Sequence, residues 1–134
     1  MKKLILIISI IFTSFNLLAQ NTYYCVSKEV NQLGFNIAKK NTINKKWESD
    51  NFVFERLEDK ISFKADWFRT INPDMTNSIP INVYGMNGNN KEFFRGINDN
   101  VFFEYQEGKF WMSVLQSEPY SKTIWSFYAE CNKN

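Results

Sequence analysis

The residues best able to carry chemistry in this chain are two cysteines, Cys25 and Cys131, which lie near opposite ends of the sequence. An isolated pair of cysteines in an oxidising compartment usually forms a disulfide. A redox pair would normally have the Cys-x-x-Cys spacing that tunes one thiolate, and this pair has nothing like that spacing. We therefore predict a structural disulfide between Cys25 and Cys131, which would fix the first and last elements of the fold side by side.

The chain contains no histidine, which excludes the Ser-His-Asp and Cys-His arrangements of nucleophilic catalysis. With both cysteines paired, a zinc site would have only carboxylates as ligands, a set that zinc rarely uses. Glu104 lies among aromatic residues, but the alternation along its strand favours a carboxylate that faces solvent. The Asn- and Asp-rich segments 72–74, 87–90 and 98–100 do not match a calcium-binding loop and are typical of turns. We therefore expect no enzyme activity, no metal site and no cofactor.

Aromatic residues make up 17% of the chain and fall on both faces of the expected C-terminal strands. A strand with one face in water would instead carry polar residues on that face. In one interpretation, residues 27–44 or 67–78 cover the second face and the rings are core. In the other, some rings line a ligand cavity or a partner-binding patch. The candidates for such a site are Arg95, Trp111, Leu115, Trp125 and Phe127.

The first twenty residues have the order of a secretory signal peptide. Two lysines precede an apolar stretch from Leu4 to Phe12, and the segment closes with Leu17-Leu18-Ala19-Gln20. A membrane-spanning helix needs roughly 20 consecutive apolar residues, and this run is about half as long. A retained N-terminal anchor is the alternative. We predict that residues 1–20 are cleaved and that residues 21–134 form a single β-rich domain, periplasmic or extracellular, with no further membrane span.

The exported domain is expected to carry no net charge. The whole chain has 16 basic and 14 acidic residues, and two of the lysines belong to the expected signal peptide. Their removal leaves 14 residues of each sign. A nucleic-acid-binding domain needs a concentrated basic face, so we expect no nucleic-acid partner.

Short strands and turns account for most of the chain from residue 51 onward. Residues 60–66 alternate between polar and apolar side chains, which predicts a strand with one buried face. The segment Asn87-Gly88-Asn89-Asn90 is typical of a tight hairpin turn, because Asn and Gly tolerate the positive φ that such turns require. Together with a strand near residues 23–27, about eight strands are expected.

The fold class that follows is all-β and mostly antiparallel: a small closed or nearly closed β-barrel, with a two-sheet sandwich as the alternative. The disulfide favours the barrel, because it would join the first and last strands where a meander must close to remove its exposed edges. One short helix is expected within residues 27–44, where Val30, Leu33 and Ile37 recur at helical spacing, although Gly34 weakens it.

The Tyr24-Cys25 pair, the late Cys131 and the Phe110-Trp111 pair resemble features of small periplasmic β-barrel proteins, including bacterial lysozyme inhibitors. The loop motif of those inhibitors is not found here, so no residue role is carried over. The architecture is also similar to that of lipocalin-like carriers. Fold similarity alone does not indicate a function. From the excess of aromatic residues we expect an exported, non-catalytic β-barrel that binds a small apolar or amphipathic ligand. The alternative is a protein-binding module of the cell envelope, such as an inhibitor or immunity protein.

Overall fold

The computed structural model describes residues 21–48, 50–64 and 77–134. The predicted signal peptide and most of the predicted loop at residues 67–78 lie outside these ranges. The described residues form one antiparallel sheet and contain no helix, so the all-β prediction is confirmed. Its strands are β1 (Asn21–Asn36), β2 (Asn41–Trp47), β3 (Asn51–Arg56), β4 (Lys60–Lys64), β5 (Ser78–Pro80), β6 (Val83–Met86), β7 (Glu92–Ile97), β8 (Val101–Gln106), β9 (Lys109–Glu118) and β10 (Ser121–Lys133).

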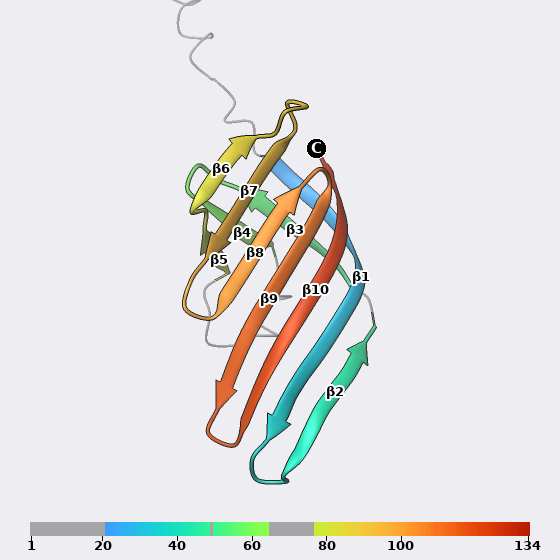
Figure 1. The fold of residues 1–134 in the computed structure, drawn as a ribbon. Helices are drawn as coiled ribbons and strands as arrows, with labels where there is room; N and C mark the ends of the chain where they lie inside the picture. The colour runs from blue at the N-terminus through green and yellow to red at the C-terminus, as the bar shows by residue number, and fades with distance from the viewer. Residues whose placement is uncertain (1–20, 49, 65–76) are drawn as a thin grey trace, which may run out of the picture.

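The sheet is strongly curled into a barrel-like body (Figure 1), and its strand order is β5-β4-β3-β1-β10-β9-β8-β7-β6. Strand β2 branches from β1 outside this order. Strand β1 has room for two partners on one edge because residues 21–26 pair with β3 and residues 30–36 pair with β2. A β-bulge between Ser27 and Glu29 separates the two halves of β1 and bends the strand.

The predicted short helix within residues 27–44 is wrong, because this segment forms the second half of β1, a turn and the start of β2. Antiparallel pairing with β10 and β2 satisfies its backbone groups. Val30 is buried, whereas Leu33 and Ile37 are exposed, so the three apolar residues do not share a buried face. The described residues form ten strands instead of about eight, because β2 lies where a helix was expected and residues 78–86 form two short strands, β5 and β6.

The predicted disulfide is confirmed. Cys25 on β1 lies directly opposite Cys131 on β10, with 4.0 Å between the Cα atoms, and both residues are buried. The bond joins the first and last strands as expected. However, these strands lie at the middle of the strand order, and the edges are β5 and β6. The expectation that the disulfide joins the two closing edges of the barrel is therefore wrong.

The short segment between β5 and β6 bridges the two edges of the sheet instead. The backbone N–H of Ile81 donates to the carbonyl of Asp59 beside β4 (2.7 Å), and that of Asn82 donates to the carbonyl of Arg95 on β7 (3.0 Å). Gly96 makes this approach sterically feasible, because a Cβ atom there would collide with the carbonyl oxygen of Pro80. The barrel is thus nearly closed by backbone contacts on both sides of residues 81–82.

Aromatic rings fill the interior of the barrel. Tyr23 stacks on Phe54, and Phe94 stacks on Tyr105, each with 4.7 Å between ring centroids. Such ring pairs contribute packing energy beyond the burial of their apolar area. We call this region the barrel core, and its largest completely buried side chains are those of Tyr23, Phe54, Phe94, Phe103 and Phe110.

Beyond the barrel core, the sheet continues as an extension made of residues 31–47 and 113–126 (Figure 1). The extension contains β2 and the adjoining parts of β1, β9 and β10. It ends in two turns, at residues 37–40 and 119–120. The backbone N–H of Ile37 donates to the carbonyl of Tyr120 at 2.7 Å, so the two turns form one connected tip.

Candidate binding surface

The five candidate binding residues lie on two different faces of the sheet, because successive side chains of a strand point to opposite faces. Arg95, Trp111 and Leu115 lie on the outer face and are exposed. Phe127 lies on the inner face and is buried in the core, and Trp125 is partly buried on the same face. The structure therefore does not bring the five together into one site.

Trp125 is held on the inner face of the extension by its neighbours. Its indole Nε1–H donates to Oε1 of Gln116 at 3.2 Å. Its ring centroid lies 5.3 Å from that of Trp47 and 6.3 Å from that of Phe127. These contacts satisfy both the polar and the apolar part of the indole, so the geometry is that of a packed side chain.

On the outer face, strand pairing aligns five side chains in one row across β7, β8, β9, β10 and β1. Directly opposed side chains on one face of an antiparallel pair lie within reach of each other, so the row forms a continuous strip. Two of the candidates, Arg95 and Trp111, therefore share this strip. The successive members of the row are Arg95, Glu104, Trp111, Tyr128 and Glu29.

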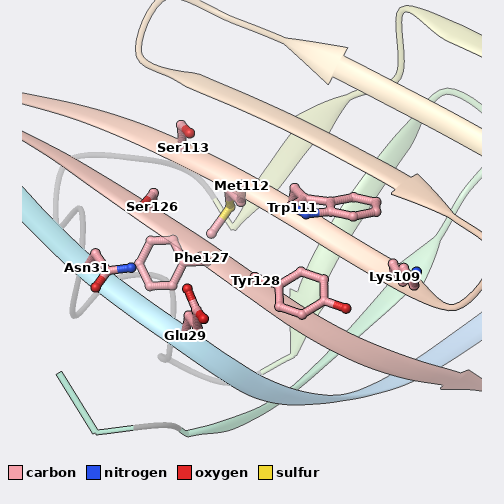
Figure 2. A pocket seen from close by; sticks show the side chains of 9 residues that line it. All are labelled: Glu29, Asn31, Lys109, Trp111, Met112, Ser113, Ser126, Phe127 and Tyr128. Atoms are coloured by element: carbon pink, nitrogen blue, oxygen red, sulfur yellow. The ribbon is translucent and has the colours of Figure 1, made fainter. Parts of the chain in front are cut away.

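A surface depression of about 430 Å³ lies at the β1 end of this row (Figure 2). The rings of Trp111 and Tyr128 pack beside each other there, with 5.5 Å between centroids and 34° between ring planes. Trp111 is 38% exposed, which leaves part of its ring free for a further contact. Polar side chains from β1, β9 and β10 surround the pair, namely Glu29, Asn31, Lys109, Ser113 and Ser126.

A second, more apolar depression of about 240 Å³ adjoins the first, and Ser113 lines both. The turn of residues 98–100 forms a polar border on one side. Exposed apolar side chains from β7, β8, β9 and β10 supply most of the remaining lining: Ile97, Phe102, Leu115 and Ile124. We call the outer-face side chains that line these two depressions the outer-face surface. Phe127 and Met112 also line the first depression, but their side chains are buried.

Arg95 lines a third depression, of about 230 Å³, farther along the outer face. Its partner across the strands is Glu104, which also lies opposite Trp111. Glu130, an acidic residue of β10, pairs with Lys28 at 3.2 Å on the protein surface. Each of these two carboxylates thus has a basic side chain beside it, Arg95 across the strands from Glu104 and Lys28 in the ion pair with Glu130.

A polar cluster lies at the side of the barrel core around Glu92 of β7. Its carboxylate accepts a hydrogen bond from the Tyr23 hydroxyl (2.7 Å) and pairs with Lys133 Nζ and Arg56 Nε, each at 2.9 Å. Burial alone would raise the pKa of Glu92, but the hydrogen bonds from Tyr23 and Lys133 and the Arg56 charge outweigh it and lower that pKa. Burial, reinforced by the bond to Glu92, strongly raises the pKa of Tyr23. Tyr23 and Lys133 both donate to Oε2 of Glu92, while Arg56 forms an ion pair with Oε1, so the four side chains make one polar network around a single carboxylate.

Several residues of the outer-face surface were not among the sequence-based candidates. Tyr128 and Ile124 belong to the face of β10 opposite to that of the two candidates Trp125 and Phe127. Glu29 lies in the segment for which a helix was expected. The alternation of residues 123–131 could have shown that Ile124 and Tyr128 share a face, but not which strands lie beside them.

Comparison of the chain with protein-family models, curated proteins and solved structures gave no match. In the described ranges, no helix has both the length and the apolar character needed to cross a lipid bilayer. Among the same residues, no three His, Cys, Asp or Glu side chains are grouped as a metal site would require. The function must therefore be inferred from the surface itself.

Proposed function

We propose that this protein is an exported, non-catalytic binding module that holds a partner protein of the cell envelope on its outer-face surface. The observation that carries the proposal is the exposed apolar group of Phe102, Leu115 and Ile124 beside the Trp111–Tyr128 pair. Contiguous apolar patches on a folded domain are typical of interaction sites. Aromatic anchors bordered by polar groups are the usual composition of protein–protein interfaces.

The barrel core favours this function over the binding of a small apolar ligand inside the barrel. An enclosed ligand needs a cavity whose walls are apolar and whose centre is empty. Here the rings of Tyr23, Phe54 and Phe110 pack against one another in the interior. The depressions that we describe lie on the outer face and open to solvent, where a partner of protein size has access to them.

The disulfide supports the proposed export of the protein. A bond between buried cysteines is compatible with folding in an oxidising environment, such as the periplasm or the extracellular space. In that environment the protein would have access to a partner protein of the cell envelope.

Site-specific photo-crosslinking in the producing cells tests the proposal. A photoreactive amino acid replaces Trp111 in one strain, Leu115 in a second and the exposed Met86 of β6 in a third. We expect the first two positions to crosslink to the same envelope protein and Met86 not to do so. The captured protein is then purified, and its affinity for the disulfide-bonded chain is measured directly.

Two charge substitutions complete the test. Leu115→Glu places a charge in the apolar depression of the outer-face surface and is expected to weaken binding of the purified partner at least tenfold, since apolar interface centres exclude charge. The matched variant Met86→Glu should bind as the unchanged protein does. Equal affinity of both variants, no common crosslink from positions 111 and 115, or a lipid retained inside the barrel in native mass spectrometry would overturn the proposal.

A further inference from the structure

The tip of the extension combines exposed apolar side chains with lysines. The two turns and the strand segments that lead to them, residues 33–46 and 115–124, contain five lysines and one acidic residue, Glu118, so this part of the chain carries a net charge of +4. The predicted domain as a whole has equal numbers of basic and acidic residues. The protein is therefore electrically polarised, and its positive end is the tip.

The lysines of the tip are available for an external partner. All five are exposed, and no ion pair to any of them occurs among the described residues. Lys45 lies 5.6 Å from the ring centroid of Trp47, a contact that leaves its charge unneutralised. The lysines are Lys39 and Lys40 in the first turn, Lys45 and Lys46 on β2, and Lys122 on β10.

The apolar side chains of the tip project from the same two turns. Ile37 is 49% exposed and Tyr120 is 68% exposed, and the hydrogen bond between their backbones holds them side by side. Phe35 lies two positions before the first turn, opposite Lys122, and is also exposed. The Asn36 side chain accepts a hydrogen bond from the backbone N–H of Lys39 at 2.8 Å, which fixes the first turn.

We propose that this tip docks on the surface of a lipid bilayer that contains anionic phospholipids. Two linked hairpin turns form a protrusion, and a protrusion with apolar and aromatic side chains suits insertion into the headgroup layer. The surrounding lysines suit the negative surface potential of such a bilayer, because their long side chains reach the headgroups while the apolar residues enter. An acidic protein partner would not need Ile37 and Tyr120 at the end of the protrusion.

Docking by the tip is independent of the proposed partner surface. The outer-face surface lies over β7–β10 and the neighbouring part of β1, whereas docking uses the two turns and the lysines around them. Bilayer docking and partner binding can therefore be tested separately, and failure of one does not decide the other.

Vesicle sedimentation with the purified disulfide-bonded protein tests the inference. We expect binding to vesicles of phosphatidylcholine and phosphatidylglycerol at 7:3, and little binding to phosphatidylcholine alone. Binding should fall as salt is raised, because surface charges are screened. Replacing Lys39 and Lys40 with Gln should lower the partition coefficient about 25-fold, since each lysine near an anionic surface contributes a factor of about five.

Two further variants distinguish binding to a bilayer from binding to a soluble polyanion. Ile37→Ser with Tyr120→Ser keeps every charge, and it should reduce vesicle binding at least tenfold while leaving weak binding to polyglutamate unchanged. The matched control, Lys28→Gln with Lys91→Gln, removes two exposed lysines that lie outside the tip and should change vesicle binding less than twofold. Circular dichroism confirms that each variant is folded.

Three results would overturn the inference. The first is no binding to the phosphatidylglycerol vesicles. The second is equal loss of binding in the tip variants and in the Lys28 and Lys91 control. The third is vesicle binding that survives the loss of Ile37 and Tyr120 side chains, which would mean that the tip binds anionic polymers by charge alone.

Discussion

The barrel core and the extension share long strands but differ in the exposure of their apolar side chains. In the core, Tyr23, Phe54 and Phe94 are completely buried and pack ring against ring. In the extension, Leu33 and Ile124 lie opposite each other on the outer face and are 52% and 50% exposed. Similar residue types therefore stabilise one region and remain accessible in the other.

The residues that stabilise the fold and the residues that we propose to bind a partner or a bilayer are therefore separated in space. The disulfide, the stacked rings and the Glu92 cluster all lie in or beside the barrel core. The lysine-rich tip and the apolar outer face lie on the extension and the strands next to it. Substitutions in the two regions should consequently differ in kind: those in the core change the free energy of unfolding, and those on the outer face change binding.

The largest expected effect is that of Phe54→Ala in the barrel core. The side chain is completely buried among Tyr23, Phe63 and Phe110, so its removal leaves a cavity in a rigid environment. We expect a loss of about 3–5 kcal/mol in the free energy of unfolding. Urea denaturation followed by circular dichroism measures it. The control Ile124→Ala should change this free energy by less than about 0.5 kcal/mol, and equal losses would contradict the division between the regions.

Removal of the disulfide should have the next largest effect. Cys25→Ala with Cys131→Ala frees the two ends of a loop that spans nearly the whole domain, so the unfolded chain gains conformational entropy. We expect a loss of about 2–5 kcal/mol, measured in the same urea experiment. Reduction of the unchanged protein with dithiothreitol serves as the control and should give a similar loss. A double variant as stable as the oxidised protein would show that pairing of β1 with β10 alone holds the core.

Glu92→Gln should have an intermediate effect. The substitution removes the charge that Arg56 and Lys133 share and weakens the acceptor of the Tyr23 hydroxyl. We expect a loss of about 1–3 kcal/mol at neutral pH, the range for disruption of a partly buried polar network. The matched variant Tyr23→Phe keeps the ring and removes one hydrogen bond, and should lose less.

The effect of Glu92→Gln should also depend on pH. The pKa of Glu92 in the folded protein lies below its ordinary value of 4.5, so the ionised form stabilises the fold above that value. This contribution disappears as the pH falls through the lowered pKa. The difference in unfolding free energy between the unchanged protein and Glu92→Gln should therefore shrink in acid, and a difference that stays constant down to pH 2 would contradict the ion-pair interpretation.

The sequence predicts most of the barrel core because its strands alternate cleanly. Ile61 and Phe63 of β4 are buried and their neighbours are not, as the alternation of residues 60–66 indicates for the part that the structure describes. The disulfide was also predictable, since only two cysteines are present. In residues 27–44 the prediction fails for a physical reason: the bulge after Ser27 shifts the alternation, and the apolar Leu33 faces solvent.

The candidate site was harder to predict because it depends on register. The row from Arg95 to Glu29 requires four strand pairings in one specific alignment, and a slip of one residue in any of them would move a side chain to the other face. Composition shows that rings are abundant, but it does not show which of them lie opposite one another. For this reason the sequence yields Trp111 as a candidate and misses its partner Tyr128.

The smallest expected effect on stability is that of Leu115→Ser, and it provides the sharpest test of the comparison. Leu115 is 42% exposed, whereas the adjacent Val114 is completely buried in the core cluster. Leu115→Ser should change the free energy of unfolding by less than about 0.5 kcal/mol, while Val114→Ser should cost about 2–4 kcal/mol because it buries a hydroxyl and leaves a cavity. Urea denaturation of the two variants measures both. If Leu115→Ser proved as costly as Val114→Ser, the protein itself would cover this side chain in solution, and a partner would have no free apolar face to bind.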